Sequence, residues 1–457
     1  MTEPNLFGDD ASLPQPTPAP TQPTATAPPR LRPVERHQME MRSASLDQLL
    51  PPDHEARAMW AYVEGLDIGL LLPDIKAVAG RPGRDANDPR ILFALWLYAT
   101  FKGIGSAREL DRLCTEHMAY QWLCGGMSVN YHSLADFRTE HVDALDQLLT
   151  DGVAALVQEG LVDLQRVAQD GMRVRASAGA SSFRREPTLQ ELLKEAQQQV
   201  AALRDQVAEP AGAATRRQQA ARQRAATERV ERVKQALENR QQLLKLREQQ
   251  KDEKGIKFEP EKLRASTTDP EARNIKMADG GTRPGFNVQF ATTTASGIVV
   301  GVDVTNSGGD GGQMGPMLEQ LQERYDQRPG EMLIDGGFTT LQDIESAEAQ
   351  GTKVYGPIKE EAKQLEEGKD PYQPKKKDGP GVAAWRQRMG LEAAKEIYRE
   401  RGATAELTNA QARNRGLYQF RVRGQRKVLA VALLYALVHN LVRARSLREA
   451  RQEVTKG

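Results

Sequence analysis

Three acidic residues of this sequence have the types and settings that could hold a catalytic metal centre. Asp170 ends the segment VDLQRVAQD, Asp335 ends EMLID, and Glu406 ends YRERGATAE. The two aspartates close short apolar runs that predict buried strands, and the glycine after each favours a turn that leaves the carboxylate exposed at the strand end. Carboxylates gathered from strand ends and one helix can bind two divalent ions about 4 Å apart, which clamp the attacking and leaving oxygens of a phosphodiester exchange.

Each of these acids also has a simpler interpretation. An aspartate before a glycine at a strand end is often an ordinary turn residue. Glu396 and Glu400 lie on the same helix-favouring stretch as Glu406 and compete with it for the third position. The metal hypothesis therefore depends on the three acids occurring together, and the structure must show whether they meet.

The pattern of apolar residues predicts the elements that would position the acids. We expect an α/β catalytic core with a mixed sheet flanked by helices, preceded by an all-α N-terminal domain and interrupted by a helical hairpin. The expected segments are a disordered Pro- and Thr-rich tail (1–35), the helical N-terminal domain (36–158), the first part of the core (159–186), the inserted hairpin or coiled coil (187–262), and the rest of the core with the C-terminal helices (263–457).

Local signals support this division. Asp88-Pro89 opens the apolar segment ILFALWLYATFKGI as a helix start. FNVQFATTT and GIVVGVDVTN predict two strands of a β-hairpin, joined near Ala295-Ser296-Gly297. The polar segment 358–382 predicts an exposed linker or loop. The inserted hairpin shows a heptad spacing that predicts either an interaction arm or, as we prefer, two helices packed on each other: Leu189, Leu193, Ala196, Val200, Leu203 and Val207.

The charge distribution indicates a nucleic-acid partner. The chain has a net charge of +1, but residues 372–457 contain 19 Lys and Arg against 7 Asp and Glu. DNA attracts such a surface by counterion release, although a solvated charged helix is the simpler explanation of a basic run alone. With two cysteines and no recognisable signal peptide, we expect a cytoplasmic, nucleoid-associated protein. We expect the apolar run 428–442 to be a buried helix and not a membrane span.

Five segments together resemble bacterial insertion-sequence DDE transposases that carry a helical N-terminal domain before a ribonuclease-H-like catalytic domain. They are RPGRDANDPRILFALWLYATFKGIGSARELDRL with the later WLCGG and HSLADFRTEH, QDGMRVRASAG, STTDPEARNIK followed by PGFNVQ, MLIDGGF, and YRERGATAELTNAQARNRGLYQFRVRG. Each segment is weak alone, but their order and spacing are specific. The resemblance implies a ribonuclease-H-like core that binds the ends of its element and cuts and transfers DNA strands.

The resemblance also implies roles for individual residues. Asp170, Asp335 and Glu406 would hold two Mg²⁺ or Mn²⁺ ions. The partner would be double-stranded DNA, both terminal inverted repeats and target, bound by at least a homodimer because two ends are paired, with no membrane involved. Phosphate contacts are expected from basic and tyrosyl side chains, namely Tyr398, Arg401, Arg413, Arg415, Lys375, Lys376 and Lys377.

Other hypotheses remain open at this stage. After the Glu, the family usually has Pro-Val-Phe-Gly, whereas this chain has Leu407, Thr408, Asn409 and Ala410. That departure motivates the alternative of a catalytically inactive, transposase-derived DNA-binding protein. The glycine-rich segment 308–315 lacks the Lys-Ser/Thr of a phosphate loop and predicts a flexible turn. A faint zinc-like spacing is more simply a buried core: Cys114, His117, Cys124 and His132.

Overall fold

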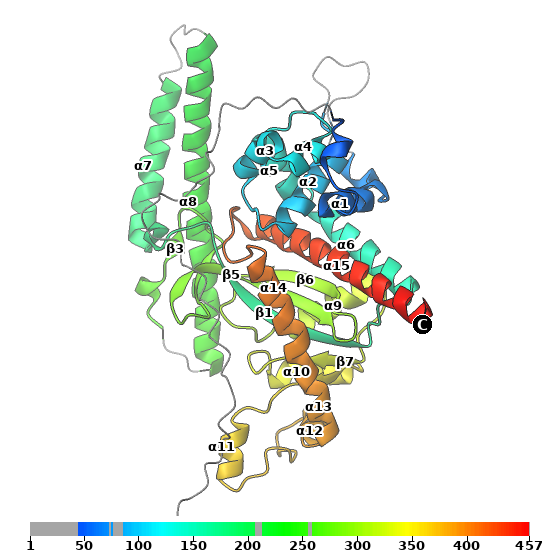
Figure 1. Ribbon diagram of the computed structural model, residues 1–457. Coiled ribbons are helices and arrows are strands. Elements are labelled where there is room, and N and C mark those ends of the chain that lie inside the picture. Colours follow the sequence, from blue (N-terminus) through cyan, green and yellow to red (C-terminus); the bar gives the residue numbers. More distant parts are fainter. Residues whose placement is uncertain (1–43, 73–74, 76–85, 206–212, 255–257, 457) are drawn as a thin grey trace, which may run out of the picture. The chain divides into compact units, whose positions relative to one another are not determined.

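The computed structural model describes residues 44–72, 75, 86–205, 213–254 and 258–456 (Figure 1). The chain divides into two compact units, Met1–Ser45 and Leu46–Gly457, and all the helices and strands described below lie in the second. The tail expected at 1–35 lies outside the described residues.

The N-terminal part of the larger unit is helical, as the sequence predicted. Asp88 caps the second of its helices by accepting a hydrogen bond from the Arg90 amide at 2.8 Å, and Pro89 occupies the first helical position. This helix is buried along nearly its whole length. The helices are α1 (Glu55–Glu64), α2 (Pro89–Phe101), α3 (Ala107–Glu116), α4 (Met118–Cys124), α5 (Tyr131–Glu140) and α6 (Val142–Gln158).

A six-stranded mixed sheet follows in the order β4-β5-β1-β7-β8, with β6 also paired to β5. The strands β4, β5, β1 and β6 pair antiparallel, whereas β1, β7 and β8 pair parallel. Two short strands, β2 and β3, form a separate ladder. The bounds are β1 (Arg166–Arg175), β2 (Phe183–Arg184), β3 (Ala265–Ser266), β4 (Arg273–Lys276), β5 (Thr282–Thr293), β6 (Val299–Thr305), β7 (Glu331–Leu333) and β8 (Lys353–Tyr355). The predicted hairpin at 295–297 joins β5 to β6.

Most of the remaining helices contact the sheet, and α15 ends the described chain. Short α11 lies inside the segment 358–382, where the sequence predicted only a linker or loop. The helices are α9 (Met314–Tyr325), α10 (Leu341–Ala349), α11 (Glu361–Glu366), α12 (Pro380–Met389), α13 (Glu392–Arg401), the π-helical turn η6 (Gly402–Glu406), α14 (Leu407–Asn414) and α15 (Gln425–Lys456). Short 3-10 helices occupy Asp47–Leu49, Gly69–Leu71, Ala180–Ser182 and Pro260–Lys262.

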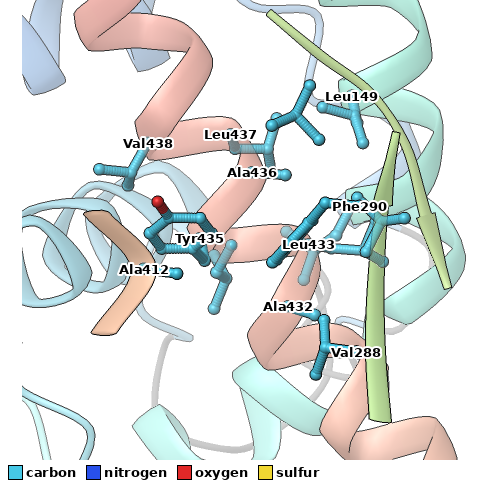
Figure 2. Packing of buried hydrophobic residues seen from close by; sticks show 14 of the residues in the cluster. Leu149, Val288, Phe290, Ala412, Ala432, Leu433, Tyr435, Ala436, Leu437 and Val438 are labelled. Carbon is cyan, nitrogen blue, oxygen red and sulfur yellow. The ribbon is translucent and has the colours of Figure 1, made fainter. Parts of the chain in front are cut away.

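Helix α15 is the element that the sheet and the N-terminal helices share. It contacts α2, α5, α6, β5 and β6, and its Tyr435 ring packs 5.5 Å from the Phe290 ring of β5 (Figure 2). By length and composition, Gln425–Thr455 is the one helix among the described residues that could cross a membrane, yet 67% of its most apolar window is buried inside the protein. The helix is therefore buried in the core, as the sequence predicted.

Helices α7 (Glu186–Asp205) and α8 (Ala213–Lys254) lie where the hairpin was predicted. They pack on each other, and a small apolar cluster joins them to β3. Leu189 and Ala196 of the predicted seam are fully buried. Val207 lies outside the described residues.

Candidate active site

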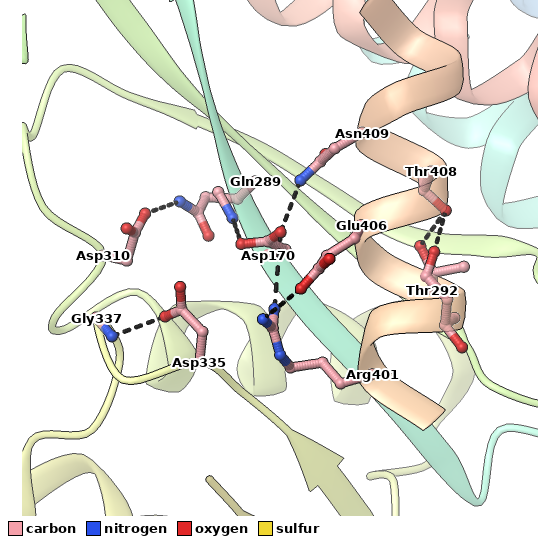
Figure 3. A network of polar contacts seen from close by, with 12 residues as sticks. Asp170, Gln289, Thr292, Asp310, Asp335, Gly337, Arg401, Glu406, Thr408 and Asn409 are labelled. Atoms are coloured by element: carbon pink, nitrogen blue, oxygen red, sulfur yellow. Dashed lines mark hydrogen bonds and ion pairs between the residues drawn. The ribbon is translucent and has the colours of Figure 1, made fainter. Parts of the chain in front are cut away.

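Asp170 lies in the middle of β1 and not at a strand end, which corrects the sequence prediction. The strand continues through Gly171 to Arg175, and Asp170 pairs with Phe290 of β5. The carboxylate is 16% exposed and accepts hydrogen bonds from the Gly171 amide at 2.9 Å and from Asn409 Nδ2, also at 2.9 Å (Figure 3). Burial raises its pKa to about 6, and the negative charge of Asp335 adds to that rise, while nearby Arg401 opposes it.

Parallel pairing brings Asp335 beside Asp170. Ala168 of β1 is the partner of Leu333 in β7, and Asp335 follows two residues later, as Asp170 follows Ala168. The same register extended by two residues therefore places Asp335, just beyond the end of β7, beside Asp170 of β1. Asp335 Oδ1 accepts a hydrogen bond from the Gly337 amide at 2.8 Å, so the glycine after this acid does form the predicted turn.

Glu406 reaches the same region from the helical layer. It is the last residue of the π-helical turn η6 and directly precedes α14, which carries Asn409 one turn later. Single π-turns within helices are rare and often occur at functional sites. Glu406 Oε1 accepts a hydrogen bond from Arg401 Nη2 at 2.9 Å, and Arg401 Nη1 lies 3.7 Å from Asp170 Oδ2. Arg401 therefore joins two of the three acids (Figure 3).

A fourth carboxylate, which the sequence interpretation missed, supports this centre. Asp310 lies in the glycine-rich loop, yet its side chain is only 8% exposed. Its Oδ1 accepts hydrogen bonds from Asn287 Nδ2 at 2.6 Å and from Gln289 Nε2 at 2.9 Å, and Arg173 Nη2 lies 3.3 Å from its Oδ2. The loop is thus anchored to the sheet behind Asp170. The signal was present in β5, where two buried amides occupy alternate positions of an apolar strand.

Two family models match this chain. Residues 252–441 match the transposase DDE domain, and residues 44–140 match a second model, described as transposase domain (DUF772). The chain is a DDE transposase by family. No curated protein and no solved structure gave a match. The segment 252–441 contains Asp335 and Glu406, whereas Asp170 lies between the two matched segments, so its assignment depends on the pairing of β1 with β7.

The donor set of this DDE transposase suits hard divalent cations. All the candidate ligands are carboxylate oxygens, which Mg²⁺ and Mn²⁺ prefer. The three acids and Asp310 outnumber the nearby guanidinium groups of Arg173 and Arg401 by two charges. No group of three or more His, Cys, Asp or Glu side chains in the described part of the chain has metal-binding geometry. Arg401 lies between two of the acids, Asp170 and Glu406.

Unsatisfied polar atoms at the same place also indicate a ligand site. Arg401 Nη1 and Asn409 Oδ1 are buried and have no hydrogen-bond partner among the described residues. Buried polar groups are otherwise nearly always paired, so such atoms beside an acid cluster are typical of a site that takes a ligand. The Asn409 oxygen and the carboxylates fit the divalent cation that the family implies, whereas the Arg401 N–H donor fits the oxygen of a phosphate.

The other residues that the sequence singled out lie in different settings. Arg401, expected to contact DNA, is 13% exposed and forms ion pairs with Asp170 and Glu406. Tyr398 lies beside it. Arg413 is exposed on α14. Arg415 packs its guanidinium 5.3 Å from the centre of the Phe101 ring, toward the N-terminal helices. The three lysines 375–377 are exposed, and Lys375 Nζ donates to Gln364 Oε1 at 3.1 Å.

The cysteine and histidine side chains of the zinc-like pattern belong to the helical part. Cys114 and Cys124 are buried free thiols, and the hydrogen bond with Cys124, together with burial, raises the pKa of Cys114. His117 Nδ1 accepts a hydrogen bond from the Ala119 amide at 3.2 Å and so caps α4. The His132 ring lies 4.0 Å from the Tyr131 ring. The two cysteines agree with the buried-core interpretation, whereas His117 and His132 are exposed.

Gly171 is the glycine that this site requires for space. A Cβ at this position would lie 2.5 Å from Gln289 Nε2 and 2.8 Å from Asn287 Oδ1, and closer still to Asp310 Oδ1. We expect Gly171→Ala to lower the free energy of unfolding by about 1–3 kcal/mol, the usual cost of overpacking. Urea denaturation measures this. Gly315→Ala is the matched control, because a Cβ there meets nothing within 4 Å. Equal stability of the two variants would contradict the packing described here.

Proposed function

We propose that this DDE transposase is catalytically active: it binds the ends of its insertion sequence, cleaves them in a metal-dependent reaction, and transfers the freed strand to target DNA. The observation that carries the proposal is that Asp170 of β1, Asp335 just after the parallel strand β7, and Glu406 of the π-helical turn lie close together. The sheet, with antiparallel strands on one side of β1 and parallel strands on the other, supports a ribonuclease-H-like core.

Each side chain of such a site would have a separate role. Asp170, Asp335 and Glu406 would hold two Mg²⁺ or Mn²⁺ ions, which would activate a water and neutralise charge on the phosphodiester. Asn409 fixes the orientation of the Asp170 carboxylate through its hydrogen bond, and the Gly337 amide does the same for Asp335. Arg401 balances part of the negative charge between Asp170 and Glu406. One phosphodiester replaces another, so strand transfer needs no covalent protein–DNA intermediate and no ATP.

The departure from the family after Glu406 gives no support to the inactive alternative. Asn409 lies within the altered block, and it is the residue that hydrogen-bonds Asp170 Oδ2. Thr408 Oγ1 of the same block accepts a hydrogen bond from Thr292 Oγ1 of β5 at 3.4 Å. The altered residues therefore attach α14 to the sheet and to the first acid, as an intact site requires.

Cleavage of a DNA carrying the element's own ends tests the proposal. We expect nicking in Mg²⁺ or Mn²⁺ and none in EDTA, with the freed 3′-hydroxyl joined to a target plasmid in a second step. Products are separated on denaturing gels, and a DNA with scrambled ends is the control. Tight binding of the ends without nicking in either metal would favour the inactive DNA-binding protein instead. Assembly on paired ends would require at least two copies of the chain, which sedimentation of the DNA complex measures.

A further inference from the structure

A basic pocket lies apart from the carboxylates, between the inserted hairpin and the sheet. Its volume is about 420 Å³. Three walls form it: the C-terminal part of α8, strand β4, and the loop 306–311 that follows β6. The polar and charged side chains of the lining are Arg247 and Gln250 from α8, Arg273 and Asn274 from β4, and Asn306 and Ser307 from the loop.

Two arginines of this pocket repel each other. Arg273 is partly buried, and its pKa is lowered by burial and by the positive charge of Arg247. Neither guanidinium forms an ion pair with a carboxylate in the part of the chain that the structure describes. Arg247 Nη1 donates to the neutral Gln250 side chain at 3.0 Å. Two unbalanced guanidinium groups facing one cavity are stabilised by an anion, and their planar forks match the oxygens of a phosphate.

The rest of the lining suits a nucleic-acid backbone. Asn274 and Ser307 place an amide and a hydroxyl at the pocket, and both can bind phosphate oxygens. Gly308 and Gly309 leave the loop backbone open to close approach, since a Cβ on Gly309 would meet nothing within 4 Å. Leu246 is 43% exposed at the same wall and offers an apolar surface to a sugar.

The loop connects this pocket to the candidate active site. Ser307 and Gly308 line the pocket, and two residues later the Asp310 side chain is buried against Asn287 and Gln289, behind Asp170. One short loop therefore joins the pocket to the candidate active site. The same loop would position both the strand and the acids.

We propose that this pocket binds a backbone phosphate of the DNA strand that leads to the catalytic acids, with Arg247 and Arg273 as its ligands. The inserted hairpin is then one wall of the DNA channel, in addition to being a helical pair packed on itself. The inference rests on the proposed function, since it takes DNA as the substrate, but it concerns residues outside the three acids. It assigns a role to a hairpin for which the sequence showed only a packing pattern.

The test is the salt dependence of DNA binding by the full chain. The double variant Arg247→Gln/Arg273→Gln is compared with wild type on a fluorescent duplex in EDTA, so that binding is measured without cleavage. We expect the slope of log Kd against log salt to fall by about one unit, the change for one lost phosphate contact. The control variant Arg222→Gln/Arg224→Gln removes the same charge from exposed positions of α8, about 35 Å along the helix. It should keep the wild-type slope.

The results distinguish a failure of the pocket hypothesis from a failure of the proposed function. An unchanged slope for Arg247→Gln/Arg273→Gln, or an equal loss in the control variant, overturns the pocket while leaving metal-dependent cleavage intact. A wild-type protein that neither binds nor cleaves DNA overturns both. Inorganic phosphate that raises the melting temperature of wild type but not of the variant, with unchanged DNA slopes, would assign the pocket to a free phosphate and overturn its DNA role. Equal melting temperatures without phosphate show that both variants fold.

Discussion

Asp170→Asn is expected to abolish metal-dependent cleavage and at the same time to stabilise the metal-free protein. Loss of one ligand oxygen removes several kcal/mol of transition-state stabilisation, which corresponds to a rate reduction of about a thousandfold or more. The amide keeps the size of the carboxylate, and its oxygen can still accept from Asn409. The variant should therefore fold and bind DNA while failing to cut it.

The stability gain follows from the raised pKa of Asp170. The folded protein holds the proton up to a pKa of about 6, whereas the unfolded chain releases it near 3.8. Stability associated with this group is thus complete below pH 4 and is lost as the pH rises through 6, at a cost of about 3 kcal/mol for a shift of about two pKa units. An asparagine carries no such penalty at pH 7.

Thermal denaturation at pH 4 and pH 7 without divalent ions measures this effect. The difference between wild type and Asp170→Asn should be small at pH 4 and large at pH 7. Asp269, whose pKa burial also raises to about 6, is present in both proteins and cancels in the comparison. Mg²⁺ should raise the melting temperature of wild type more than that of the variant. If the variant were less stable than wild type at pH 7, the prediction would be wrong. The hydrogen bonds and ion pair of the Asp170 carboxylate would then stabilise the protein by more than burial of the charge destabilises it.

The positions of the acids in the chain could be predicted, but their local geometry could not. Apolar runs ending in Asp-Gly made Asp170 and Asp335 candidates, and their occurrence together with Glu406 distinguished them from ordinary turn residues. The same pattern was misleading for Gly171, since a glycine within a strand and a glycine in a turn look alike in sequence. What distinguishes them is a neighbour far along the chain, Asp310, that leaves no room for a Cβ.

Long-range polar contacts explain the remaining differences. The loop around Asp310 was taken as a flexible turn because its glycines carry no local preference for order, and the order comes instead from Asn287 and Gln289. The resemblance to the family implied a DNA contact for Arg401, whereas the structure pairs its largely buried side chain with Asp170 and Glu406. Helices and strands follow from periodicity, whereas these contacts depend on the assembled sheet.

Glu406→Gln is expected to abolish cleavage while leaving fold and DNA binding in place. The carboxylate is 60% exposed, so its loss changes stability little, and Arg401 keeps its ion pair with Asp170. The structure places the two other candidates for the third ligand, Glu396 and Glu400, in different surroundings. Glu400 Oε1 pairs with Arg166 Nη1 at 2.7 Å, and Arg166 lies four residues before Asp170, about 13 Å along β1. Glu396 is exposed on α13.

Three matched variants decide the assignment of the third ligand. Glu396→Gln, Glu400→Gln and Glu406→Gln remove the same charge from one helical segment, so any general loss of DNA affinity or stability is common to all three. Cleavage of the element's ends should fall about a thousandfold or more in Glu406→Gln alone. The π-helical turn gives the reason, because its extra residue rotates Glu406 and Asn409 together by about 100° relative to a regular helix. If Glu400→Gln lost cleavage and Glu406→Gln kept it, the third ligand would lie before that turn and the site described here would be wrong.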